Sequence, residues 1–230
     1  MLKSISTWVL VASAALAIAE PISLDARDLA EPMPLEAREM ETREVEARTV
    51  RNGLATFDTD NISAGIAAVK ELGYYGGVYY QGIDAVALGV NGKVVAGVKP
   101  ASEPNVAAFG ITTQVLRSKA AIRSNFTGSV TKSFSLKSLY FGCAVGTVES
   151  VASVATSCKF ALAGYDAQSN LLAYQAFNFS PDKGLTSNMI KATFNSDFQD
   201  LVYVRLAATY GGLNILGATL IDNITYTIAV

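Results

Sequence analysis

A cluster of tyrosines is the first set of side chains in this chain that suits a binding site. Aromatic rings stack on the C–H faces of sugars, while nearby amide and carboxylate groups bond the hydroxyls. Gly76 and Gly77 lie in the middle of the cluster. The candidate glycan-binding residues are Tyr74, Tyr75, Tyr79, Tyr80, Gln81, Asp84 and Asn105. Strand alternation predicts a competing arrangement, in which one Tyr of each pair completes the core and its neighbour lies on the surface.

Two aspartates from opposite ends of one domain form a candidate cation site. Asp58 and Asp222 come close together if the terminal strands pair, and Asn223 adds an amide oxygen. Carboxylate, amide and backbone oxygens are the ligands that Ca²⁺ prefers. We therefore expect no required cofactor, with a structural Ca²⁺ on these three residues as the candidate metal. In the alternative, Asp58 caps a turn and Asp222 lies exposed at a sheet edge.

The composition excludes several kinds of catalytic site. The chain has no His, which removes a Ser-His-Asp triad, an imidazole base and every His-ligated metal. Its two Cys are too few for a zinc site made of thiolates alone. It has no nucleophile elbow, phosphate loop or metalloprotease helix. Two carboxylates suffice for a glycoside hydrolase, so that activity stays open beside a non-catalytic protein.

The N-terminus has the pattern of a secretory signal peptide. Lys3 provides a positive n-region, residues 8–16 are almost entirely apolar, and Ala17 and Ala19 are small residues that precede a cleavage site at Glu20. The apolar run is shorter than the ~20 residues that span a bilayer. Residues 1–19 are therefore expected to be removed, leaving a protein that is secreted, extracellular or held in a cell wall and has no membrane-inserted segment.

A charged segment follows, over residues 20–52. It holds nine acidic residues and five Arg, and it repeats the pattern Leu24-Asp-Ala-Arg27 imperfectly at Leu35–Arg38 and Val45–Arg48. With three Pro and no aromatic residue, it cannot bury a core of its own. We interpret it as a pro-segment trimmed during secretion, or as a linker that stays attached.

Residues 53–230 are predicted to form one all-β domain, a jelly-roll-like antiparallel β-sandwich. Short apolar runs rich in Val, Thr, Tyr and Phe are separated by turn signals, without the long helices of a parallel sheet. At most one or two short helices are expected, one of them between Asn61 and Leu72. The expected strands are 84–90 and 93–98, joined by Asn91-Gly92 in a hairpin, and 159–165, 171–179, 201–207 and 220–228.

Two covalent features fit an oxidising compartment. Cys143 and Cys158 lie 15 positions apart in what look like neighbouring strands, and one disulfide is their expected state. The sequence carries four N-glycosylation sequons, at Asn61, Asn125, Asn178 and Asn223. Asn125 lies in a polar stretch and suits modification best, while Pro181 after the Asn178 sequon makes that one the weakest.

The order of motifs resembles a group of fungal secreted proteins of uncharacterised function. The resemblance rests on Phe57-Asp58, on Tyr74 to Tyr80, on Ala101 to Val106, and on Leu220 to Tyr226. It is also similar to bacterial exported β-sandwich domains with an FDD…YGG…DN(I/V) layout, from which Thr59 departs. The resemblance implies a jelly roll like that of carbohydrate-binding modules, with adjacent first and last strands and a structural Ca²⁺ near the termini. It implies no established activity.

These features together predict a secreted, non-catalytic glycoprotein whose partner is a cell-wall polysaccharide or another glycan. The alternatives are a structural or host-interaction protein without a sugar site, and the carboxylate glycosidase. Lys and Arg form no cluster in residues 53–230, so no nucleic-acid partner is expected. The oligomeric state stays open.

Overall fold

The computed structural model describes residues 49–59, 69–87, 89–90, 93–94, 97–110, 119–145, 154–182, 186–211 and 217–230. The described residues form strands and connecting turns without a helix, so an all-β fold is confirmed. The expected signal peptide and residues 20–48 lie outside these ranges, as does most of the helix expected before Leu72, whose last residues from Val69 belong to a strand. No helix able to cross a membrane occurs among the described residues.

The strands are β1 (Val50–Ala55), β2 (Val69–Tyr75), β3 (Val78–Ala87), β4 (Gly89–Val90), β5 (Lys93–Val94), β6 (Val98–Lys99), β7 (Asn105–Gly110), β8 (Ala121–Arg123), β9 (Ser133–Val145), β10 (Val154–Ala155), β11 (Cys158–Tyr165), β12 (Leu171–Phe179), β13 (Ser187–Asn188), β14 (Ile190–Thr193), β15 (Tyr203–Tyr210) and β16 (Gly217–Ala229).

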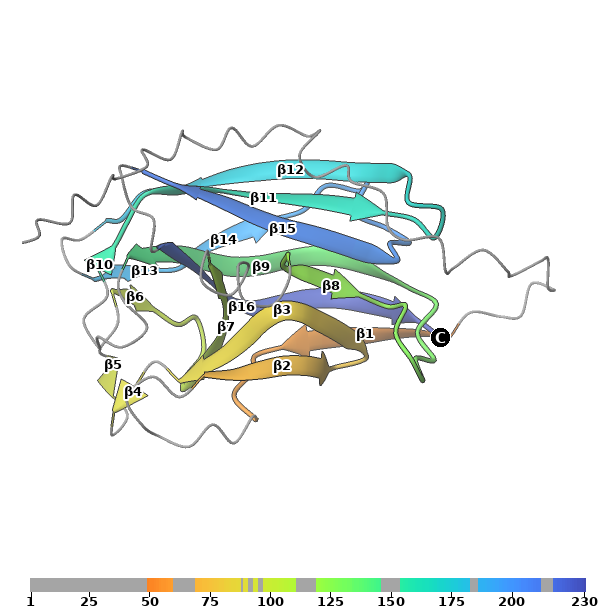
Figure 1. Ribbon diagram of the computed structural model, residues 1–230, viewed down its shortest axis with the longest axis horizontal. Coiled ribbons are helices and arrows are strands. Elements are labelled where there is room, and N and C mark those ends of the chain that lie inside the picture. The colour runs from red at the N-terminus through yellow and green to blue at the C-terminus, as the bar shows by residue number, and fades with distance from the viewer. Residues whose placement is uncertain are drawn as a thin grey trace, which may run out of the picture.

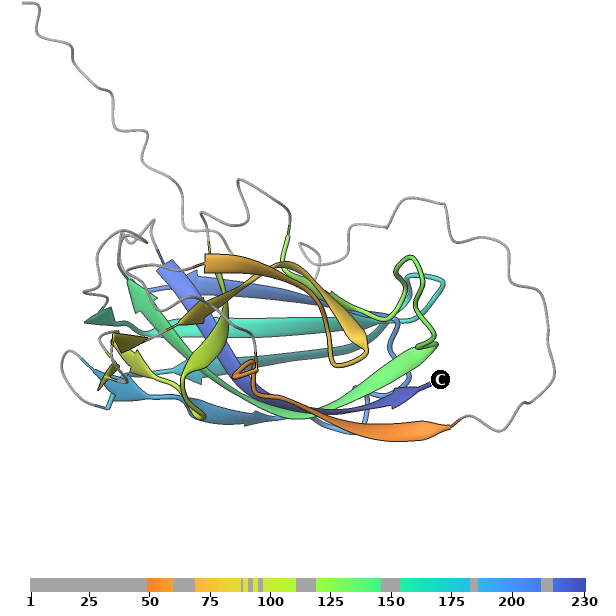
Figure 2. The same ribbon diagram turned by 90° about the horizontal axis from the view of Figure 1, so that it is seen from below.

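One curled antiparallel sheet supplies both layers of the sandwich. The first layer contains β1, β16, β9, β10 and β14, and the second contains β2, β3, β8, β15, β11 and β12. Strand β7 pairs with β3 on one side and with β16 on the other, so it connects the two layers. Seen from below, β2 and β3 lie on the opposite side of the molecule from β1 (Figures 1 and 2).

The first and last strands pair, as the resemblance implied. Val50 lies opposite Ala229 and Ala55 opposite Ile224 in the antiparallel register of β1 and β16. Residues 50–52, which the sequence analysis placed in the charged segment, are therefore part of the sheet. Their polar side chains Arg51 and Asn52 are exposed, as is common for an edge strand, and this is why composition alone did not mark them as sheet residues.

The core lies between the layers and follows the two-residue period of the strands. In β11, Phe160 and Leu162 point into the main core, whereas Ala161 and Ala163 belong to a separate apolar cluster on the outer face. Phe141 of β9 contacts Phe160 across the layers, with ring centroids 4.9 Å apart. Aromatic contacts of this kind make the two layers one cooperative unit.

The expected strands 159–165, 171–179, 201–207 and 220–228 correspond to β11, β12, β15 and β16. The hairpin predicted around Asn91-Gly92 is confirmed in register, because Gly89 pairs with Val94 and Val90 with Lys93 among the described residues. Residues 84–87 belong instead to β3, which pairs with β2, β7 and β8.

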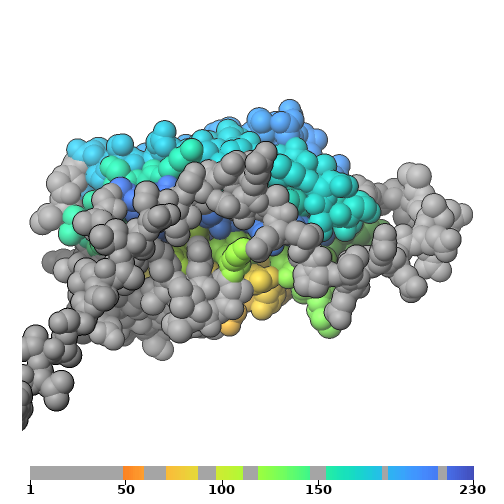
Figure 3. Space-filling view, turned by 45° about the horizontal axis from the view of Figure 1, so that its top comes forward, coloured from red at the N-terminus to blue at the C-terminus, as the bar shows by residue number. Residues whose placement is uncertain are grey.

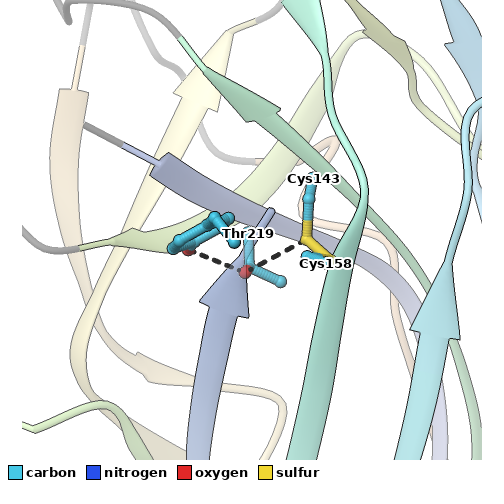
Figure 4. Close-up of a disulfide and its surroundings, with 4 residues drawn as sticks. Cys143, Cys158 and Thr219 are labelled. Atoms are coloured by element: carbon cyan, nitrogen blue, oxygen red, sulfur yellow. Dashed lines mark hydrogen bonds between the residues drawn. A yellow bond between two sulfur atoms is a disulfide. The ribbon is translucent and has the colours of Figure 1, made fainter. Parts of the chain in front are cut away.

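The Cys143–Cys158 disulfide is present and joins the two layers. Cys143 lies in β9 and Cys158 in β11, and these strands are not hydrogen-bonded neighbours, contrary to the sequence expectation. Figure 4 shows Thr219 of β16 beside the bridge, where its hydroxyl donates to Cys143 Sγ over 3.5 Å. The hydroxyl of Tyr210 lies 3.0 Å from Thr219 Oγ1 and completes this buried chain of contacts.

Replacing both cysteines by alanine should lower the free energy of unfolding by about 3 kcal/mol, because the bridge closes a loop of about 15 residues in the unfolded chain. Urea unfolding of the oxidised wild type and the double variant measures this difference. Thr219→Val is the matched control, since it removes the hydroxyl beside the bridge and keeps the bridge itself. Equal unfolding midpoints for wild type and double variant would contradict the prediction.

Candidate binding face and cation site

An outward-facing row of side chains crosses the second layer. Its members, in order from β11 through β15, β8 and β3 to β2, are Tyr165, Tyr203, Arg123, Tyr79 and Tyr74, each directly opposite the next in the strand register. Residues that lie opposite each other in paired strands place their side chains on one face of a sheet. The row faces away from the main core, because Tyr80 and Val204, which alternate with its members, lie in that core.

The two ends of this row differ in exposure. Tyr165 and Tyr203 stack with centroids 4.5 Å apart and are only 2% and 1% exposed. Tyr74 is 63% exposed and Tyr79 is half-buried, so the β2–β3 end of the row is the accessible part. In Figure 3 the surface of β11 and β12, in teal, lies above the yellow and green surface of earlier strands on the same side of the molecule.

Phe126 completes the accessible end, although the sequence analysis did not name it. Its ring lies 5.4 Å from the ring of Tyr74 and 5.9 Å from that of Tyr79, measured between centroids. We call Tyr74, Tyr79 and Phe126 the aromatic trio. Phe126 follows Asn125 in a loop that comes after β8, and its place beside Tyr74 depends on the pairing of β8 with β3. No local pattern in the sequence could have revealed that pairing.

Polar groups next to the trio are held by hydrogen bonds. Arg123 donates through Nη1 to Gln81 Oε1 over 2.7 Å and through Nε to Asn125 Oδ1 over 3.2 Å. Gln81 has the outward position predicted for a ligand-binding residue, since it lies two residues after Tyr79 on the same face. The guanidinium and the two amides therefore form a fixed polar border beside the aromatic surface.

Four of the predicted glycan-binding residues lie elsewhere. Tyr80 is 0% exposed in the core, and Tyr75 packs inward against it and Phe57. Asp84 is 2% exposed and cannot reach a ligand at the trio. Asn105 is buried and donates through Nδ2 to Phe57 O, which places it at the cation site instead. The competing expectation of alternating core and surface tyrosines is thus the arrangement found, with Tyr74 and Tyr79 outward.

The turn between β2 and β3 is held by hydrogen bonds from two side chains of other segments. Tyr226 of β16 donates its hydroxyl to Gly76 O over 2.6 Å, and Thr131 Oγ1 donates to Gly77 O over 2.7 Å. Gly76 has φ of +61°, and a Cβ there would collide with the Tyr226 hydroxyl. Glycine is required at this position both by the backbone angle and by the close approach.

The structure brings the two predicted cation-site aspartates together. Asp222 lies at an irregularity in β16, where the strand register shifts, and it is 0% exposed rather than at an exposed edge. Its Oδ2 accepts the Ser102 N–H over 2.7 Å and its Oδ1 accepts the Asn223 N–H over 2.7 Å. Asp58 is half-buried, and its Oδ1 accepts the Asn105 N–H over 3.2 Å.

Burial, together with the charge of Asp58, raises the pKa of Asp222 from 3.8 to about 6, although hydrogen bonds from the backbone N–H groups of Ser102, Asn223 and Ala101 oppose the shift. None of these groups is cationic. Asn223, with φ of +47°, has a buried Oδ1 with no hydrogen-bond partner among the described residues. The two interacting carboxylates, and an amide oxygen from the residue next to Asp222, are oxygen donors of the kind that a hard cation takes.

The three candidate residues supply fewer oxygen ligands than a Ca²⁺ ion takes. The described residues contain no group of three or more His, Cys, Asp and Glu around one point. A Ca²⁺ ion takes six to eight oxygens, so Asp58, Asp222 and Asn223 would have to be joined by backbone oxygens and water. Because solvent does not reach the Asp222 carboxyl, this particular group cannot protonate a glycosidic oxygen.

Without divalent cations, stability should fall with rising pH through the titration of Asp222. The folded-state pKa of about 6 lies above the ordinary value of 3.8, so the folded protein retains a proton that the unfolded chain loses in this interval. The free energy of unfolding in EDTA should therefore decrease from pH 4 to pH 6 and then level off. Urea unfolding across this range measures the slope.

Asp222→Asn should flatten that slope, because an amide does not titrate. Asp197→Asn, at an exposed position, provides the matched control and should keep the wild-type slope. A slope that is unchanged in Asp222→Asn would show that other groups cause the pH dependence.

Comparisons with known proteins give matches at the level of solved structures. No family model matches the chain, and no curated protein matches it in sequence. A DUF4465 family protein from Bacteroides caccae is similar over 76% of this chain and 98% of its own, with 13% identity and a TM-score of 0.49. An apo-form cyclase from Fischerella is similar over 77% of this chain and 96% of its own, with 12% identity and a TM-score of 0.38.

Proposed function

We propose that this protein is a secreted, non-catalytic β-sandwich that binds glycan through the aromatic trio and the polar border beside it. The observation that supports the proposal most is the exposed ring of Tyr74, placed on one outward face with Tyr79 and Phe126. Flat aromatic surfaces bordered by fixed hydrogen-bonding groups are the usual means of holding a sugar.

The polar border supplies the second part of recognition. Arg123 and Gln81 are already bonded to each other, so their side chains need little further ordering when a ligand arrives. The bonds from Arg123 to Gln81 and Asn125 hold the plane of the guanidinium in one orientation beside the rings. A polysaccharide chain would lie over the rings and present its hydroxyls to this border.

The alternative of a structural or host-interaction protein without a sugar site requires that the tyrosines only complete the core. Tyr75 and Tyr80 do so, whereas Tyr74 contributes most of its surface to solvent. Secretion rests on the N-terminal sequence pattern and is compatible with the disulfide, which persists in oxidising compartments. We propose an extracellular or cell-wall location on these two grounds.

The proposal is tested with a panel of soluble cell-wall polysaccharides and a glycan array, using the chain exported to the bacterial periplasm. Tyr74→Ala and Tyr79→Ala should each weaken binding at least about fivefold, since an aromatic contact contributes about 1 kcal/mol beyond the area it buries. Their melting temperatures should stay close to that of the wild type, because neither ring lies in the main core.

Tyr140→Ala is the matched control for these variants. Tyr140 is a half-buried tyrosine of β9, on the other layer, so its loss should leave glycan affinity unchanged. Absence of binding across the panel, or equal loss in Tyr74→Ala and Tyr140→Ala, would overturn the proposed function.

We also propose that Ca²⁺ occupies the site of Asp58, Asp222 and Asn223 as a structural ion. A ligand bound only by the folded state at a hundredfold excess over Kd adds about 2.7 kcal/mol of stability. The melting temperature should then rise by about 5–10 °C over that in EDTA, given the size of the domain. Thermal unfolding with Ca²⁺ and with EDTA measures the shift.

Asp222→Asn should lose most of this shift, and Asp197→Asn should keep it. If Ca²⁺ leaves the melting temperature of the wild type unchanged, the two aspartates serve only to bind backbone N–H groups.

A further inference from the structure

Of the three sequons among the described residues, only the one at Asn125 borders the aromatic trio. Asn61 lies outside the described residues. Asn223 lies at the irregularity in β16 and its side-chain amide oxygen is buried, so its amide is enclosed by the protein and not presented for a glycan in the folded domain. Asn178 is exposed on β12. Asn125 is half-buried in the loop after β8, directly before Phe126.

Asn125 lies on the same side of the sheet as the outward row. It is two residues after Arg123, and its Oδ1 accepts the Arg123 Nε–H over 3.2 Å. Arg123 itself is directly opposite Tyr79 in the register of β3 and β8. Because a guanidinium has no acceptor, the amide must turn its oxygen toward Arg123 and its nitrogen away from it. The Nδ2 atom, which carries the sugar in an N-linked glycan, is therefore not consumed by this bond.

We propose that an N-linked glycan on Asn125 packs its first sugars against the aromatic trio and so covers the glycan-binding face of the protein. The covering role rests on the proposed function, whereas the packing does not. In the secretory pathway a lipid-linked oligosaccharide diphosphate supplies the sugar. The Asn125 Nδ2–C1 bond forms, Nδ2 releases a proton, and the lipid diphosphate leaves.

The trio is suited to this role because it is exposed to solvent and because one of its members, Phe126, directly follows Asn125 in the sequence. Phe126 is the residue after the modified Asn, so the first sugar begins beside a ring that contacts both Tyr74 and Tyr79. Packing on these rings shields apolar surface that is otherwise open to water at Tyr74. Asn178 has no such platform in its sequon, since Phe179, the residue after it, is buried in the main core.

The packing is tested by a double-mutant cycle on the full chain secreted from a glycosylating eukaryotic host. Thr127→Ala removes the Asn125 sequon while keeping the Asn125–Arg123 bond. It should lower the melting temperature by about 1–4 °C in the wild-type background and by much less in Tyr74→Ala. Ser180→Ala removes the Asn178 sequon, and its effect should add to that of Tyr74→Ala. Peptide mass spectrometry reports occupancy at each Asn.

Covering is tested by binding of the same polysaccharide panel to these secreted proteins. Thr127→Ala should bind at least about tenfold more tightly than the glycosylated wild type, and Ser180→Ala should not. An unoccupied Asn125, or additive effects of Thr127→Ala and Tyr74→Ala on the melting temperature, would overturn the proposal. Coupled melting temperatures with no binding by any variant would leave the packing intact and overturn only the proposed function and the covering.

Discussion

The buried carboxylate of Asp222 is the interaction on which the arrangement of the terminal strands depends. It lies where β16 changes partner, from β7 on its first half to β1 on its second. One of its oxygens binds the Ser102 N–H in the segment that leads into β7, and the other binds the N–H of Asn223, which turns the strand. Because β7 is also the strand that joins the two layers, a single side chain fixes the point at which the sandwich closes. The energetic cost of burying this charge is visible in its raised pKa.

Much of the fold follows from the two-residue period of the sequence. Strands such as 159–165 and 171–179 could be predicted because Phe160 and Leu162 alternate with small residues, and because turn residues separate the strands. A disulfide could be predicted because the chain has two cysteines and a pattern of secretion into an oxidising compartment. The strands that the disulfide joins could not be predicted. Cys143 and Cys158 join two layers, and the layer to which a strand belongs depends on sheet order, which local patterns do not encode.

The candidate site shows the same limit more sharply. Alternation predicts that one tyrosine of each pair faces outward, but it does not say which one. The choice of Tyr74 and Tyr79 is set by the register of β2 on β3. Phe126 lies beside these two tyrosines because β8 pairs with β3. Asn105 lies away from them, where its side-chain amide donates a hydrogen bond to Phe57 O. Long-range pairing therefore decides the composition of the site.

The hydrogen bonds from Tyr226 and Thr131 to the Gly76–Gly77 turn have a thermodynamic consequence for any ligand that binds the aromatic trio. The hairpin that carries Tyr74 and Tyr79 is held at its tip by the last strand, so its backbone is ordered before a ligand arrives. Association then loses little conformational entropy from the protein, and most of the remaining entropic cost falls on the ligand. A stiff, extended polymer would pay less of that cost than a flexible oligosaccharide of the same composition.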